Sequence, residues 1–158
     1  MKLKKIIILF LVTFSTITFS EKAPNFKLKD QYNVIQTLKE YRGKTIILVF
    51  WGSYCSACKD ELPIIEEVYK EYGENKQNVI ILGVNKEDSD KMKSFLRKNK
   101  YSFPTVLDED TQVIKQYLIE LIPTILFIDS KGKIVEKFIG SLEKNQIEEI
   151  IAKINSNI

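Results

Sequence analysis

Three continuous apolar runs dominate the hydrophobic pattern of the chain. They cover residues 45–51, 78–85 and 125–128, and they are rich in β-branched side chains. Runs without alternating polar positions are typical of strands that are buried on both faces of a sheet. The pattern therefore predicts three central strands at these positions.

Weaker patterns predict four shorter strands outside these runs. Apolar residues in these segments are few or alternate with polar ones, which is typical of strands at the margin of a sheet. The last of them follows a turn rich in polar residues and glycine, so it is expected to form a hairpin with the third central strand. The four segments cover residues 26–30, 34–38, 103–107 and 133–140.

Amphipathic segments between the strands predict four helices. In the first, Leu62, Ile65, Val68 and Tyr69 recur at spacings of three and four, which places them on one helical face. The four segments cover residues 56–72, 89–98, 111–117 and 143–154. Strands that alternate with helices predict an α/β fold in which a central mixed β-sheet is flanked by helices on both faces.

The two cysteines of the chain, Cys55 and Cys58, lie between the first apolar run and the first helix. Thiols at this spacing can form a disulfide with each other, and the positive end of the helix dipole favours the thiolate of the first. A Cys-x-x-Cys pair between a strand and a helix is typical of a dithiol–disulfide exchange site. We expect Cys55 to be the nucleophile and Cys58 to resolve the mixed disulfide that it forms.

Two other roles for the cysteine pair fit the sequence less well. A structural disulfide across so short a loop would constrain little chain and stabilise the fold only weakly. Half of a zinc site would need carboxylates or a second chain, because the sequence has no histidine and no further cysteine. We therefore expect a redox-active pair with no metal and no cofactor.

Two residues outside the cysteine pair are candidates for chemistry. Glu61 shares a helix face with Cys58, and a carboxyl beside a buried thiol would have a raised pKa and could carry its proton. Glu61 could equally be a solvated helix charge. Pro123 precedes the third apolar run, either as an ordinary trans proline at the start of a strand or as a cis proline that turns the backbone of Ile122 towards the cysteines.

Aromatic side chains lie directly before the cysteine pair. Trp51 could pack against the disulfide, and Tyr54 could form part of a surface on which a protein client docks. Both could equally be ordinary core or rim residues. The position six residues before Cys55 is Val49, which offers no proton acceptor.

The first 20 residues have the features of an export signal. Lys2, Lys4 and Lys5 precede an apolar run at residues 6–12, and small residues stand third and first before a cut after Ser20. This pattern predicts a signal peptide that directs the protein to an exported, oxidising compartment.

The domain organisation follows from this segment and from the length of the chain. Its 158 residues predict one folded domain over residues 21–158, preceded by a signal peptide over residues 1–20. The alternative is an uncleaved anchor in which residues 6–19 enter the membrane. We expect the domain in the periplasm or at the outer face of the cytoplasmic membrane.

The net charge of +3 comes from the amino terminus. Three of the 24 basic side chains lie in the first five residues, and the remaining 21 are matched by 21 acidic ones. A neutral domain without a basic excess does not predict a nucleic-acid-binding protein. The sequence also contains nothing that requires a dimer, so we expect a monomer.

These motifs together resemble the exported TlpA/ResA/DsbE (CcmG)-type thiol–disulfide oxidoreductases of the thioredoxin-like superfamily. The resemblance covers roughly residues 23–155 and depends on three blocks: Phe50-Trp51-Gly52-Ser53-Tyr54-Cys55-Ser56-Ala57-Cys58-Lys59, Glu61-Leu62-Pro63 and Ile122-Pro123-Thr124. It implies a thioredoxin fold with a short N-terminal hairpin and an extra strand and helix at about residues 103–117.

The resemblance also implies roles for the site residues. Glu61 would be the acid that this subgroup carries, and Pro123 would be the cis-proline of the family. Ile122 and Thr124 beside it would contact the substrate, together with Trp51 and Tyr54.

The expected activity is reduction of disulfides in client proteins, such as apocytochrome c or an exported methionine sulfoxide reductase. A membrane electron donor of the CcdA/DsbD type would supply the electrons. The dipeptide Ser56-Ala57 departs from the family, so the reduction potential cannot be taken from its members. The motif lacks the histidine with which strong oxidants stabilise the thiolate, and this absence favours a reductant. The alternatives are an oxidant that forms disulfides and a redox-inert binding module with the thioredoxin fold.

Overall fold

The three continuous apolar runs form the centre of a five-stranded sheet. Strands β4 (Val79–Asn85), β3 (Thr45–Phe50) and β6 (Thr124–Ile128) lie side by side, with β5 (Thr105–Leu107) and β7 (Ile134–Ile139) at the two edges. β3, β4 and β5 are parallel, whereas β6 runs antiparallel to both β3 and β7. Every residue of β3, β4 and β6 is buried, which explains why these runs contain few polar positions.

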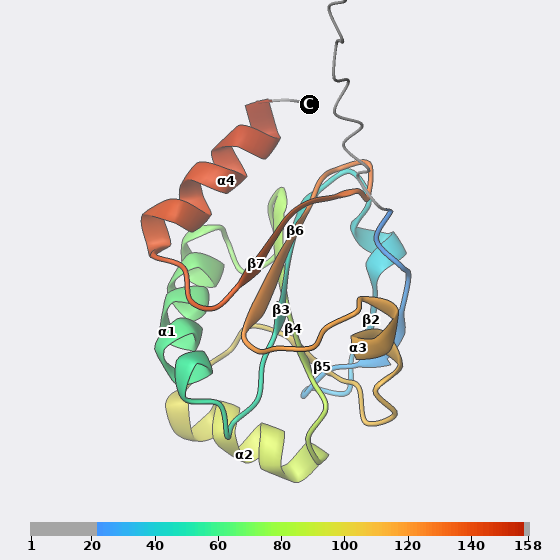
Figure 1. Ribbon diagram of the computed structural model, residues 1–158, viewed down its shortest axis with the longest axis vertical. Helices are drawn as coiled ribbons and strands as arrows, with labels where there is room; N and C mark the ends of the chain where they lie inside the picture. Colours follow the sequence, from blue (N-terminus) through green and yellow to red (C-terminus); the bar gives the residue numbers. More distant parts are fainter. Residues whose placement is uncertain (1–21, 157–158) are drawn as a thin grey trace, which may run out of the picture.

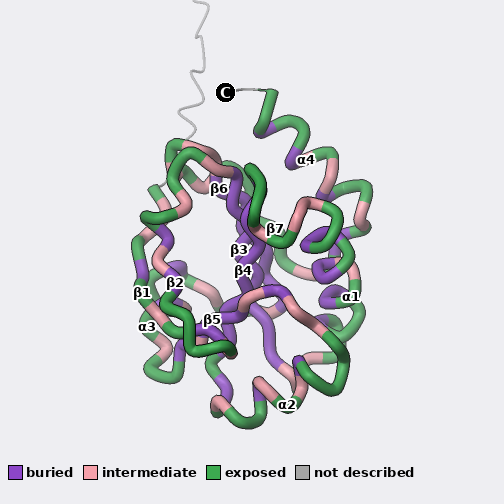
Figure 2. Tube along the Cα trace, turned by 180° about the vertical axis from the view of Figure 1, so that it is seen from behind, coloured by how far each residue is buried: buried purple, intermediate pink, exposed green. Residues whose placement is uncertain are grey.

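Three helices cover one face of this sheet. They are α1 (Ser56–Glu71), α2 (Ser89–Asn99) and α4 (Lys144–Ser156), and their buried apolar side chains join one core cluster with β3, β4 and β6. Figure 1 shows α1 and α4 beside the sheet, with α2 at the end of the molecule where α1 begins. Figure 2 shows the buried strands between the layers.

Shorter elements cover the opposite face. The helix α3 (Gln112–Gln116), the 3-10 helix η1 (Leu38–Tyr41) and the segment around β1 (Lys27–Lys29) pack there on a second apolar cluster. Figure 1 shows α3 on the side of the sheet away from α1 and α4. Helices therefore lie on both faces, as predicted.

The N-terminal strands form a small sheet of their own. β1 pairs antiparallel with β2 (Ile35–Thr37), and the side chain of Gln31 joins this hairpin to the edge of the main sheet. Its Oε1 accepts a hydrogen bond from Thr105 N at 2.7 Å, and its Nε2 donates to Phe103 O at 3.0 Å. An isolated antiparallel bridge between Asp30 and Val106 adds a backbone contact at the same edge.

The structure is a computed structural model, and it describes residues 22–156. The predicted strands and helices form with bounds that differ by one or two residues, whereas η1 is too short to produce a periodic pattern. The predicted signal segment, residues 1–20, lies outside the described residues. Within 22–156, no helix is long and apolar enough to cross a membrane.

Candidate active site

The cysteine pair lies at the start of α1, where the chain leaves β3. Cys55 is the N-cap of α1 and Cys58 lies in its first turn, and the two form a disulfide with Cα atoms 5.2 Å apart. The Sγ of Cys55 accepts a hydrogen bond from Cys58 N at 3.1 Å. Cys58 is fully buried and Cys55 is half-buried. The first sulfur is therefore the one that a protein substrate can reach.

The Cys55 sulfur lies at the positive end of a helix dipole. Its position at the amino end of a 16-residue helix places it where backbone N–H groups carry partial positive charge. Such an environment lowers the pKa of a thiol and makes it a better nucleophile near neutral pH.

Glu61 lies one turn beyond Cys58 and has no exposed surface. Its Oε2 accepts a hydrogen bond from Leu142 N at 2.8 Å, and its Oε1 has no hydrogen-bond partner among the described residues. Burial raises the pKa of Glu61 to about 7; the bond from Leu142 opposes this shift and the charge of Glu143 adds to it. The interpretation of Glu61 as a solvated helix charge is therefore wrong.

The peptide bond between Ile122 and Pro123 is cis, as the family resemblance implied, so the trans alternative is wrong. The carbonyl oxygen of Ile122 lies 3.5 Å from the Sγ of Cys55. Thr124 is buried and its hydroxyl donates to Leu121 O at 2.7 Å, so it stabilises this bend but presents no exposed hydroxyl to a client. The structure thus brings Cys55, Cys58, Glu61 and Pro123 to one end of the sheet.

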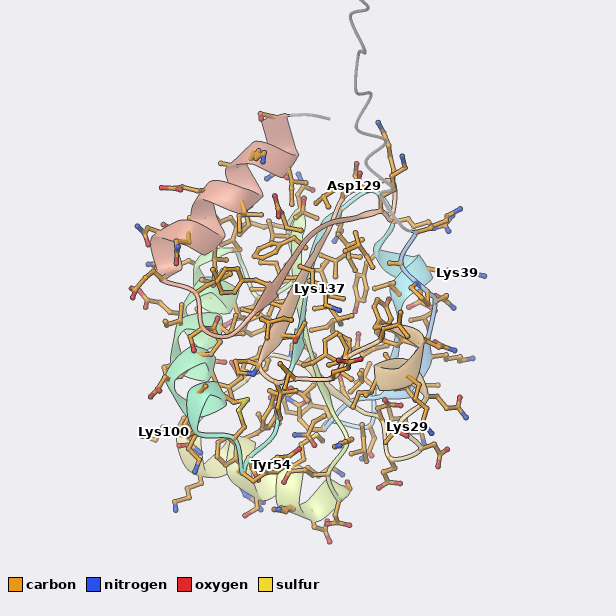
Figure 3. All side chains as sticks on the ribbon, in the orientation of Figure 1. Lys29, Lys39, Tyr54, Lys100, Asp129 and Lys137 are labelled. Carbon is orange, nitrogen blue, oxygen red and sulfur yellow. A yellow bond between two sulfur atoms is a disulfide. The ribbon has the colours of Figure 1, made fainter. Side chains whose placement is uncertain are left out.

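The two aromatic residues before the cysteines have different environments. Trp51 is buried in the same cluster as Cys58, and its ring centroid lies 5.4 Å from that of Phe95. Tyr54 is 58% exposed, and the Nζ of Lys91 lies 5.8 Å from its ring centroid. Figure 3 shows Tyr54 at the end of the molecule, between the start of α1 and α2. Trp51 is thus a core residue, and Tyr54 is available at the surface.

A buried carboxylate, Glu87, holds the loop before Cys55 and was not expected from the sequence. It accepts hydrogen bonds from Ser53 N at 2.5 Å and Ser53 Oγ at 2.7 Å, and it pairs with Lys91 Nζ at 2.8 Å. Asn85 joins this network, donating to Glu87 at 3.1 Å and to Trp51 O at 3.3 Å.

The network keeps Glu87 ionised. Burial favours its neutral form, but the hydrogen bonds from Lys91, Ser53 and Asn85 outweigh burial and lower its pKa to about 2. The one available signal in the sequence is that Asn85 and Glu87 are polar residues directly after a buried strand, where loops often carry functional groups.

Two hollows are lined in part by the residues that lead to Cys55. The smaller, of about 70 Å³, is largely apolar and lies on the side of Ile122, with Tyr54 and Trp51 in its lining. The larger, of about 380 Å³, lies on the side of α2 and is lined by Ser53, Lys59, Phe95, Lys98, Asn99 and Tyr101. Among residues 22–156, no group of three or more His, Cys, Asp or Glu side chains is arranged to hold a metal ion.

Comparisons with known proteins show which families and folds this chain resembles. The model of the AhpC/TSA family matches residues 19–137. A thiol–disulfide oxidoreductase ResA of Bacillus cereus is 36% identical over 134 residues, which is 85% of this chain and 77% of that protein.

Solved structures with the same fold include StoA from Bacillus subtilis, with a TM-score of 0.71 and 30% identity over 80% of this chain and 96% of that one. A putative thiol:disulfide interchange protein DsbE from Chlorobium tepidum superimposes with a TM-score of 0.78 at 24% identity, over 85% and 96% of the two chains.

Proposed function

Because the chain belongs to the AhpC/TSA family and, within it, to the ResA-type thiol–disulfide oxidoreductases, we propose that it reduces disulfide bonds in exported client proteins. The observation that carries this proposal is the pairing of an accessible Cys55 with a buried Cys58, one helical turn from a buried Glu61 whose pKa is about 7. A carboxyl that titrates near neutral pH can accept and return a thiol proton at the pH at which the protein works.

The proposed reaction begins with the reduced protein. The Cys55 thiolate attacks one sulfur of the client disulfide and forms a mixed disulfide with it. The other client sulfur leaves as a thiolate. Cys58 then gives its proton to the Glu61 carboxylate and attacks the Cys55 sulfur. The second client sulfur leaves as a thiolate, and the Cys55–Cys58 disulfide of the structure is formed. The client gains two electrons and the protein loses two.

The position of Ile122 supports a route for the client backbone. Its carbonyl oxygen lies beside the Cys55 sulfur, so a backbone N–H of the client could donate to it while the client sulfur reaches Cys55. Tyr54 supplies an exposed aromatic surface at the same place.

The partners and location are part of the same proposal. We place the domain outside the cytoplasmic membrane, directed there by residues 1–20, with an electron donor of the CcdA/DsbD type. Apocytochrome c and an exported methionine sulfoxide reductase are the clients we propose. A protein that reduces clients in an oxidising compartment needs such an electron supply, because its own disulfide must be reopened after each cycle.

The reduction potential of the Cys55–Cys58 pair tests the direction. A potential near or below about −230 mV, in the thioredoxin–glutaredoxin range, would support a reductant, whereas one near about −120 mV, in the DsbA range, would contradict it and favour the oxidant.

The roles of the two sulfurs are tested by trapping. A Cys58→Ser variant should accumulate a mixed disulfide with a disulfide-bonded client peptide, seen as a mass increase that a reducing agent reverses. The matched Cys55→Ser variant should trap none. Trapping by neither variant would favour the redox-inert binding module.

A further inference from the structure

The larger of the two hollows combines positive charge with aromatic walls. Lys59 from α1 and Lys98 from α2 both line it, although they belong to different elements, and both side chains are exposed. Neither lysine forms an ion pair with any described residue, whereas the nearby Lys91 is paired with Glu87. The two ammonium groups are thus available to an external anion.

The aromatic walls are held in place by packing. The ring of Phe95 lies 5.4 Å from that of Trp51 and 6.3 Å from that of Tyr101, between centroids. Ring pairs at such distances contribute favourable contacts beyond their buried area and restrict each other's motion. The walls of the hollow are therefore in place before a ligand binds. The aromatic rings can contact the methylene groups of a bound side chain, and the lysines can pair with its carboxylate.

The other basic residues of α2 lie away from the hollow. Lys93, Arg97 and Lys100 recur at spacings of four and three, which places them on a different helix face from Phe95, Lys98 and Asn99. The acidic residues of α2 lie at its other end, where Asp88 caps the first turn and Asp90 follows. Figure 3 shows Lys100 on the same side of the molecule as the start of α1. Two carboxylates contact the lining, since Glu87 accepts from Ser53 and Glu66 acts on Tyr101, but each is paired with a lysine outside the hollow. The unpaired charges at the hollow are therefore those of Lys59 and Lys98.

We propose that this hollow binds an acidic side chain of the client, placed close in sequence to the cysteine that Cys55 attacks. This inference rests on the proposed function, since it requires a polypeptide client at Cys55. The cysteines themselves do not line the hollow, but residues on both sides of them in sequence do: Ser53 lies two residues before Cys55, and Lys59 directly follows Cys58. Complementary charge at such a site speeds encounter and selects among clients more than it adds affinity.

The test compares two model peptides. Each carries one intramolecular disulfide, flanked on both sides by glutamates in one peptide and by glutamines in the other. At low ionic strength, the reduced protein should reduce the glutamate peptide about threefold to tenfold faster in kcat/KM, since exposed ion pairs each contribute modestly. This preference should weaken as salt is added.

Matched variants locate the preference. Lys98→Gln should remove at least half of it, whereas Lys39→Gln, which removes an equally exposed lysine on η1 far from Tyr54, should retain it. Reduction of the small neutral disulfide hydroxyethyl disulfide should be unchanged in both variants. Equal rates for the two peptides in the unmodified protein would overturn the inference, and so would an equal loss in both variants, which would indicate general charge steering.

Should the protein reduce neither peptide nor hydroxyethyl disulfide, NMR titration of the oxidised protein with a cysteine-free glutamate peptide would still examine the hollow. Shifts centred on Lys98, Asn99 and Tyr101 would support it, and shifts elsewhere would overturn it. Binding to anionic phosphatidylglycerol vesicles that is lost in Lys98→Gln, without any preference between peptides, would assign the surface to the membrane and also overturn it.

Discussion

Replacing Glu61 by glutamine should change how the stability of the oxidised protein depends on pH. Burial raises the pKa of Glu61 from 4.5 to about 7. Between these values the folded protein binds more protons than the unfolded chain, so the free energy of unfolding falls as pH rises through this window. The ionised carboxylate thereby costs the native state about 3 kcal/mol above pH 7.

Glutamine keeps the shape of the side chain and an oxygen that can accept from Leu142 N, but it cannot ionise. Any packing cost of the substitution is independent of pH. The stability of Glu61→Gln relative to the unmodified protein should therefore increase by about 2 to 3 kcal/mol between pH 5 and pH 8.

Urea denaturation at pH 5, 6, 7 and 8 measures this difference. The single tryptophan, Trp51, is buried and supplies the fluorescence signal for unfolding. Asp60→Asn is the matched control, because it removes an exposed carboxyl at the neighbouring position of α1 and should show no such trend. If the stability difference between Glu61→Gln and the unmodified protein is the same at pH 5 and pH 8, the reasoning about burial is refuted.

Three further predictions concern the site and its frame. Resolution of the mixed disulfide by Cys58 should accelerate as pH rises through about 7, because ionised Glu61 then accepts the proton of the Cys58 thiol. Quenched-flow kinetics of the mixed disulfide measure this rate, and an identical dependence on pH in Glu61→Gln would contradict the role of Glu61. Glu87→Gln should lower the free energy of unfolding at pH 7 by about 1–3 kcal/mol through weaker bonds from Ser53. Because the folded pKa of Glu87 is about 2, this loss should shrink as pH falls from about 4.5 towards 2 in urea titrations, and a loss constant with pH would count against an ionised Glu87. Gly83→Ala should lower the free energy of unfolding by about 1–3 kcal/mol in the same titration, because the added methyl carbon would lie 2.4 Å from Thr105 Oγ1 and 2.8 Å from Trp51 Nε1. An unchanged urea midpoint would show that the sheet adjusts to the methyl group.

The elements of this fold could be predicted from the sequence because burial leaves a direct mark on it. β3, β4 and β6 are buried throughout, so their sequences contain almost no polar residue. The apolar face of α1 likewise repeats with the period of a helix. Such patterns report which side chains avoid water, and they are local enough to be read along one chain.

The chemistry of the site was only partly predictable. Cys55 and Cys58 are recognisable from their spacing and from the strand and helix that flank them. Local sequence alone leaves open whether Pro123 is cis and whether Glu61 is buried. The family resemblance implied a cis-proline and a role for Glu61, and the structure shows the cis bond and the burial. The burial of Glu61 depends on Leu142, which is 81 residues away, and no periodic pattern encodes such a contact.

The contacts that hold the loop before Cys55 and the segment at Ser102 could not be predicted either, because they also join residues far apart in the sequence. Glu87 contacts Ser53 across 34 residues, and Glu66 on α1 accepts from the backbone of Ser102 across 36 residues. Each is a side chain that satisfies a backbone group of a distant segment. Hydrophobic periodicity contains no information about such pairs, although a polar residue at a buried helix position is a reason to look for them.

The loop before Cys55 is held by hydrogen bonds from outside the motif, whereas the side chains of the two residues between the cysteines lie outside these bonds, so the two parts of the site tolerate substitution differently. Trp51 N donates to Val84 O, and Asn85 and Glu87 bind the next residues of the loop, so β4 and the residues directly after it hold the loop from outside the motif. The side chains of Ser56 and Ala57, between the cysteines, are exposed and lie outside this network. Substitution of this dipeptide can therefore change the immediate surroundings of the two sulfurs without removing the hydrogen bonds that hold the loop.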